Sequence, residues 1–183
     1  MIRNLSITLA VVFALTAGAD ETCPLHEQHM KERAAAAPQQ KQQHAHGAHA
    51  EAVDARGAEA MGFSQQKTKH TFRLHADGGA IEVRAIDGSD RESIASVRTH
   101  LAEIARLFPN GDFAKPEYIH GKIPDGVPVM LELLGEIDWK YEEVERGARV
   151  RIRTRNARAR EAIHAFLRFQ IDDHRTGDNG KVE

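Results

Sequence analysis

The residues with the clearest capacity for chemistry are histidines, which occur eleven times in 183 residues. One group follows the start of the chain, in "CPLHEQHM" and "HAHGAH". Its candidate ligands are Cys23, His26, His29, Met30, His44, His46 and His49. Thiolate, imidazole and thioether together suit soft ions such as Cu(I), and imidazole also binds Zn(II), Ni(II) and Cu(II). Metal capture by this segment is one interpretation, and a solvated tail that binds nothing is the other.

A second group of histidines is spread over the rest of the chain, at His70, His100, His120, His164 and His174. His70 alternates with Phe72 and Leu74 and should point inward, and His174 lies about 20° from Ile163 on a helical wheel. His174 also falls near a helix end, where its charged form would suit the dipole. These imidazoles could share a metal ion, although no pair has the spacing of H-E-x-x-H. The alternative is that each one simply hydrogen-bonds a strand or loop carbonyl.

His100 stands next to the apolar Leu101, and His120 lies in a proline-rich loop. His164 is about 100° from the apolar side of its helix, so we expect it at the edge of the buried stripe. The spacing does not fix whether these rings meet in space.

The elements that position these residues follow an export signal. Residues 1–19 contain Arg3, an apolar run over residues 7–15 and the small cleavage site Ala17-Gly18-Ala19. This pattern predicts a signal peptide cut after Ala19, and hence a periplasmic or secreted protein. Cys23 lacks the lead-in of a lipid-attachment site, and as the one cysteine of the chain it cannot form an internal disulfide.

Composition divides the remaining chain. Residues 20–60 are rich in Ala, Gln and His and poor in large apolar side chains, so we expect a mobile, at most locally helical segment. Residues 61–178 should form a single domain, with a tail at 179–183. The net charge of −2 gives no electrostatic reason to bind nucleic acid, and no later stretch is apolar enough to span a membrane.

Periodicity within the domain predicts the order ββααββα. Alternating residues form hairpins over about 68–85 and 137–154, and helical spacing covers about 90–108, 127–134 and 157–173. Asp90 or Ser89 can cap the first long helix and Asn156 the last. Residues 111–128, with three prolines, should be a loop. The predicted fold class is α+β, with a four-stranded antiparallel sheet covered by helices on one face.

Arginines mark the other face of the predicted sheet. Arg149, Arg151 and Arg153 share one side of a strand, and Arg73 and Arg84 can join them. We expect a solvated face, paired with the acidic residues Glu82, Asp138 and Glu142. The alternative is a surface that docks on an anion or on another envelope protein. The G-x-S-x-G, P-loop and G-x-G-x-x-G motifs of common enzymes do not occur in the sequence.

Four stretches resemble a family of small exported bacterial proteins of unknown function: "MGFSQQKTKHTF", "DGGAIEV", "GDFAKPEYIHGKIPDGVP" and "HAFLRFQIDDHRTGD". That family often carries two successive histidines in the first motif, whereas Lys69 precedes His70 here. The start "CPLH" also resembles the "CPMH" of heavy-metal-binding domains, without their later cysteines. An aspartate carbamoyltransferase activity is not supported, because "RIRTR" only partly matches the carbamoyl-phosphate loop and the chain is too short.

The sequence therefore predicts an exported protein that binds or buffers copper or zinc through histidines. Two alternatives stay open. One is an interaction module that docks on another envelope protein, and the other is a metal-dependent enzyme with a histidine-lined cleft.

Overall fold

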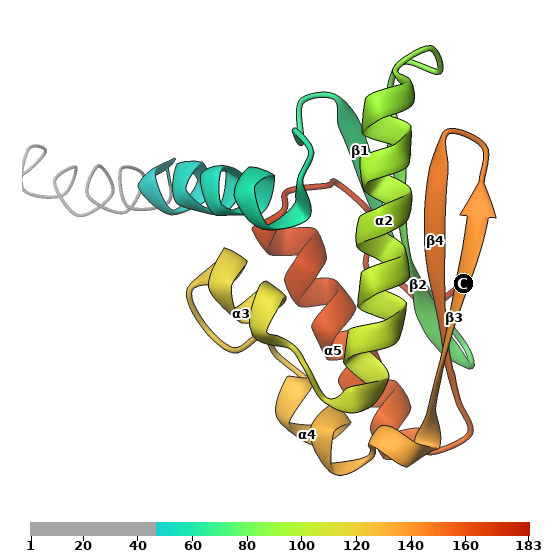
Figure 1. Ribbon diagram of the computed structural model, residues 1–183. Helices are drawn as coiled ribbons and strands as arrows, with labels where there is room; N and C mark the ends of the chain where they lie inside the picture. Colours follow the sequence, from blue (N-terminus) through green and yellow to red (C-terminus); the bar gives the residue numbers. More distant parts are fainter. Residues whose placement is uncertain (1–46) are drawn as a thin grey trace, which may run out of the picture. The chain divides into compact units, whose positions relative to one another are not determined.

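The computed structural model describes residues 47–183, all within one compact unit. Its regular elements, shown in Figure 1, are a helix over residues 47–61, β1 (Thr68–His75), β2 (Gly78–Ala85), α2 (Arg91–Leu107), α3 (Ala114–His120), α4 (Val127–Glu132), β3 (Ile137–Val144), β4 (Gly147–Thr154) and α5 (Ala157–Asp173). Short 3-10 turns occupy Phe108–Asn110, directly after α2, and Leu134–Glu136, between α4 and β3.

The four strands form one antiparallel sheet in the order β1-β2-β4-β3, which confirms the predicted α+β class. The two long helices, α2 and α5, pack on one face of this sheet (Figure 1). Val83, Val150 and Ile152 point toward them and are fully buried. Side chains alternate across a strand, so the intervening charged residues lie on the open face.

Side chains start both long helices where the sequence indicates. The Asp90 carboxylate accepts a hydrogen bond from the Ser93 backbone nitrogen at 3.0 Å, and the Asn156 side chain accepts from Arg158 and Ala159 at 2.9 and 3.1 Å. Each cap satisfies backbone donors that have no partner inside the helix.

Close backbone approach places α5 against both the sheet and α4. A Cβ atom on Gly79 would lie 2.2 Å from a Leu167 methyl carbon, and one on Gly126 would lie 2.1 Å from the Ala162 carbonyl oxygen. Gly126 also has a φ of +81°, which a residue with a side chain rarely adopts. Glycine at these two positions therefore sets how deeply α5 is seated.

The folded unit extends beyond the predicted boundaries at both ends. Residues 47–61 are helical, and Val53, Gly57 and Met61, spaced four apart, are buried on one side of that helix. Ala-rich sequence favours helix, and this narrow apolar stripe is enough to pack it on the domain. At the other end, Val182 bridges to Leu74, and the Glu183 backbone nitrogen donates to the Leu74 carbonyl at 2.9 Å.

The predicted loop over residues 111–128 contains the seven-residue helix α3. Proline weighs against helix in a sequence pattern, but Pro116 is the third residue of α3, where its missing N–H has no partner to lose. This helix carries His120 at its last position, so it matters for the site.

Candidate functional site

Four histidines line one small cavity, with a volume of about 50 Å³, between the sheet and the helices. They come from four separate elements: His70 from β1, His100 from α2, His120 from α3 and His174 from the residue that follows α5. Most of the remaining wall is apolar, and Met61 contributes to it. The cavity is large enough for a few atoms, such as an ion or one to two water molecules.

Alternation along the strand and the turn of the helices place these side chains at the cavity. His70 lies on the inward face of β1 with Phe72 and Leu74, as predicted, and is 9% exposed. His100 is buried next to Leu101 on α2. His120 is 2% exposed, because α3 turns it inward just before Gly121 ends the helix.

The rings are in contact with one another. His70 stacks on His174 with a centroid distance of 5.3 Å and an interplanar angle of 4°. His120 meets the other side of this pair edge-on, 4.9 Å from His174. Phe63 lies against both His70 and His100, at 5.9 and 5.6 Å. Three imidazoles therefore form a continuous group, and Phe63 links His100 to it.

Both ring nitrogens of His120 have hydrogen-bond partners. Nδ1 donates to an Asp173 carboxylate oxygen at 2.5 Å, which leaves Nε2 of the neutral ring as an acceptor, 3.1 Å from the Gln170 side-chain amide, whose oxygen and nitrogen positions are interchangeable. The other oxygen of Asp173 contacts His49, on the helix of residues 47–61, at 2.8 Å. A carboxylate on imidazole is a common acid–base pair, but this one is buried and fully bonded, so it fixes His120 in place.

Two other histidines are not satisfied in this way. His70 Nε2 and His100 Nδ1 are buried and have no hydrogen-bond partner among residues 47–183. A buried polar group without a partner costs about 1–3 kcal/mol. Two such groups at one cavity call for an explanation, and a bound ion or water is one.

Burial keeps these imidazoles neutral. It lowers the pKa of His70 to about 4 and that of His100 to about 3, the latter with help from the positive charge of Lys115. Burial also lowers the pKa of His120, although Asp173 opposes the shift, and it lowers the pKa of His174 well below the ordinary value. Burial therefore leaves His174 without the charge that would suit the helix dipole. Neutral imidazole is the form that binds metals.

His164 lies outside this group. It is 7% exposed, not at the edge of the buried stripe, and its Nε2 donates to the backbone carbonyls of His75 and Gly78 at 3.0 and 2.9 Å. It joins α5 to the β1–β2 turn and does not line the cavity. This histidine matches the alternative prediction, a ring that hydrogen-bonds strand or loop carbonyls.

The amino-terminal candidates lie mostly outside the described residues. Cys23, His26, His29, Met30, His44 and His46 precede residue 47, so their role stays a prediction. His49 is described, and it contacts Asp173 behind the cavity.

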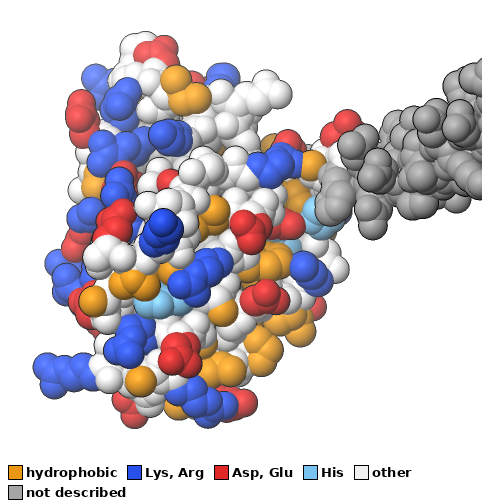
Figure 2. Space-filling model, turned by 180° about the vertical axis from the view of Figure 1, so that it is seen from behind, with side chains coloured by type: hydrophobic (Ala, Val, Ile, Leu, Met, Phe, Trp, Pro, Cys, Tyr) orange, Lys and Arg blue, Asp and Glu red, His pale blue; other side chains and the backbone are white. Residues whose placement is uncertain are grey.

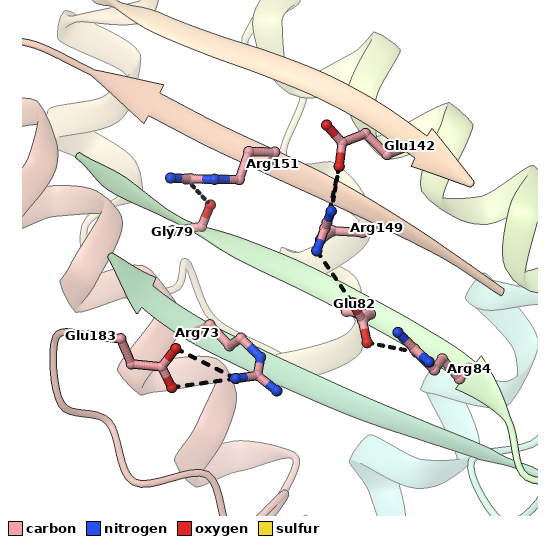
Figure 3. A network of polar contacts seen from close by, with 8 residues as sticks. All are labelled: Arg73, Gly79, Glu82, Arg84, Glu142, Arg149, Arg151 and Glu183. Carbon is pink, nitrogen blue, oxygen red and sulfur yellow. Dashed lines mark hydrogen bonds and ion pairs between the residues drawn. The ribbon is translucent and has the colours of Figure 1, made fainter. Parts of the chain in front are cut away.

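The open face of the sheet holds its arginines in local ion pairs (Figure 3). Arg149 donates to Glu142 at 2.6 Å and Arg84 to Glu82 at 2.7 Å. Arg153 stands opposite Asp138 in the register of β3 and β4, and its ion pair, at 3.7 Å, is with Asp77. Basic and acidic side chains are intermixed on the molecule seen from behind (Figure 2). The interpretation as an internally paired face is confirmed for Glu82 and Glu142.

Three residues at or beside the cavity were missed by sequence reasoning: Met61, Gln170 and Asp173. The spacing of Gln170 and His174, four residues apart on one helix, was a usable signal for Gln170. Asp173 pairs with a histidine 53 residues away, which no local pattern reveals.

Within residues 47–183, no three His, Cys, Asp or Glu side chains are placed to hold one ion in this conformation. No helix in the same range is long and apolar enough to cross a bilayer. Comparison with models of known protein families, with curated proteins and with solved structures found no match. The resemblance to exported proteins stays a prediction, and the function must be inferred from the cavity.

Proposed function

We propose that this chain is an exported protein that binds a transition metal ion, copper or zinc, through the histidines of its cavity. One observation carries the proposal: four histidines from four elements line a single cavity, and two of them hold buried ring nitrogens with no partner among residues 47–183. Buried polar groups are nearly always paired. A metal ion in the cavity would give these nitrogens a partner, and burial favours the neutral rings that binding requires.

Histidine packing alone is a weaker explanation. A structural histidine in this same domain looks different, since His164 spends its N–H on two carbonyls. His70 and His100 gain no such bonds, and an apolar residue at either position would avoid the cost of burying an unpaired nitrogen. A binding function would explain why histidine is present at these two positions despite that cost.

The amino-terminal residues extend the proposal. The thiol, thioether and imidazoles between Cys23 and His46 would collect the ion outside the cytoplasm, and the cavity would hold it. The role as a docking module on another envelope protein stays a prediction, and the ion pairs of the sheet face do not favour it.

Calorimetric titration of the exported chain with Cu(I) under nitrogen, Cu(II) and Zn(II) tests the proposal. The double variant His70→Leu/His100→Leu should bind one equivalent less of at least one ion than the wild type. His75→Gln is the matched control, because this histidine lies on β1 but does not line the cavity. Equal stoichiometry in wild type and double variant, with both folded by circular dichroism, would overturn the proposal.

Export has a separate test. Amino-terminal sequencing of the protein from a bacterial periplasmic fraction should begin at Asp20. An intact amino terminus in the cytoplasmic fraction would contradict the predicted cleavage.

A further inference from the structure

The cavity wall offers ligands without negative charge. Its lining contains four imidazoles, the Met61 thioether and the Gln170 amide, but no carboxylate. The one charged residue on the wall is Lys115, whose ammonium lies 2.6 Å from Glu103 and 3.2 Å from the Ala60 carbonyl. Asp173 lies behind His120, where it already contacts two histidines.

This charge balance favours a monovalent ion. The cost of moving an ion from water into an apolar interior rises with the square of its charge, so it is about fourfold larger for a divalent than for a monovalent ion. Carboxylate or thiolate ligands usually offset that cost in zinc and copper(II) sites. The described residues supply none on the cavity wall, and Lys115 adds a positive charge nearby.

Met61 supplies a soft ligand. It is 6% exposed, lines the cavity, and is held there by the helix of residues 47–61. Gly57, one turn earlier, leaves the space that its methyl group occupies: a Cβ atom at Gly57 would lie 3.0 Å from the Met61 methyl carbon. Thioether sulfur selects Cu(I) over harder divalent ions.

The number of available ligands points the same way. A structural zinc site needs four ligands in a tetrahedron. Residues 47–183 hold no group of three His, Cys, Asp or Glu side chains suited to one ion. Both nitrogens of His120 are occupied by hydrogen bonds. Two unpaired imidazole nitrogens and one thioether fall short of the four ligands of a structural zinc site, and the soft sulfur among them is a ligand that favours Cu(I).

Resting on the proposed function, we propose that the cavity binds Cu(I) in preference to Cu(II) and Zn(II), through His70 Nε2, His100 Nδ1 and the Met61 sulfur. The remaining rings, His120 and His174, form the wall that keeps this site dry. The ion enters already reduced, and no redox step is involved.

Methionine methyl groups report directly on this site. The chain has four methionines, of which Met1 is in the signal and Met30, Met61 and Met130 remain after export. The exported chain, labelled with carbon-13 at the methionine methyl groups, is titrated with Cu(I) under nitrogen and separately with Zn(II). Cu(I) should shift the Met61 resonance and leave that of Met130, a fully buried residue outside the cavity, in place. Zn(II) should leave both unchanged.

Competition with a coloured Cu(I) chelator measures how much the Met61 sulfur contributes to Cu(I) affinity. Met61→Leu conserves volume and removes the sulfur. We expect it to weaken Cu(I) binding at this site by at least about tenfold, in line with the effect of disturbing a metal's surroundings. Met130→Leu should retain wild-type affinity.

The outcomes separate the two proposals. Cu(I) that shifts only the Met30 resonance, or a cavity that takes Zn(II) more tightly than Cu(I), overturns the copper(I) inference and leaves metal binding standing. Unchanged Cu(I) affinity in Met61→Leu also overturns it. Both proposals fail if neither ion shifts the methyl resonances and the wild type binds no more metal than the His70→Leu/His100→Leu variant.

Discussion

Helix α5 carries a histidine at each end, and the two differ in what their nitrogens do. Near its start, His164 donates to two carbonyls of the β1–β2 turn. Just past its end, His174 has only a long contact, 3.4 Å from Nδ1 to the Gln65 side-chain oxygen, and its ring stacks on His70, whose Nε2 has no partner in residues 47–183. Both ends are poorly exposed and the residue type is the same. The contrast between His164 and His70, which are both buried, shows that hydrogen-bond saturation, more than burial, separates a histidine that holds the fold from one available to a ligand.

Lowering the pH should produce the largest loss of stability, and it acts on His70 and His100, whose ring nitrogens lack hydrogen-bond partners within residues 47–183. The pKa of His70 falls from about 6.5 in the unfolded chain to about 4 in the fold, and that of His100 to about 3. Below pH 6.5 the unfolded chain therefore binds more protons, and stability is lost as the pH falls toward the folded values. Between pH 7.5 and 5.0 each histidine should remove about 2 kcal/mol from the free energy of unfolding of the metal-free protein.

Urea unfolding at the two pH values measures this loss. His120 and His174 surround the same cavity, and because burial lowers the pKa of both, they add to the slope. The control is His70→Leu, which should lose about 2 kcal/mol less than the wild type over the same interval. Equal pH dependence in the two proteins would mean that His70 is solvated.

Replacing the saturated histidine should have the next largest effect. His164→Leu removes the donor to the carbonyls of His75 and Gly78, both at the buried junction of α5 with the hairpin. We expect the free energy of unfolding at pH 7.5 to fall by about 2–3 kcal/mol. His70→Leu should leave it unchanged or raise it by about 1 kcal/mol, because it removes an unpaired polar atom. Equal losses of stability in His164→Leu and His70→Leu would contradict the distinction between paired and unpaired histidines.

Asp173 tests whether His120, a cavity histidine with both nitrogens hydrogen-bonded, also stabilises the fold and is not a metal ligand. Its carboxylate bonds His120 and His49, and these hydrogen bonds lower the pKa of Asp173 although burial acts to raise it. Asp173→Asn keeps the shape but loses the charge, so stability at pH 7.5 should fall by about 1–2 kcal/mol. Metal stoichiometry at the cavity should stay at the wild-type value, since His70 and His100 are untouched. Loss of the bound ion with full stability would place His120 among the ligands.

Sequence patterns predicted the sheet, both long helices and the inward direction of His70, because each depends on alternation or helical spacing within a few residues. They could not predict which rings meet. His120 reaches the cavity through α3, which the prolines disguise as a loop, and its partner Asp173 stands 53 residues away. The hydrogen bonding of each ring was equally hidden, because only the fold of the β1–β2 turn gives His164 its carbonyls and leaves His70, on the adjoining strand, without a partner for Nε2 among residues 47–183.

The smallest loss of stability is expected on the open face of the sheet, where charged groups form ion pairs but remain in contact with solvent. Arg149 contacts Glu142 at 2.6 Å, and both side chains remain partly exposed. Glu142→Gln should lower the free energy of unfolding by less than about 1 kcal/mol, because solvent and salt screen such pairs. The loss should shrink further in about 0.5 M NaCl, whereas the loss in His164→Leu, which removes buried neutral hydrogen bonds, should not depend on salt. A salt-independent loss of about 2 kcal/mol or more in Glu142→Gln would show that saturation stabilises this fold equally at the surface and in the core.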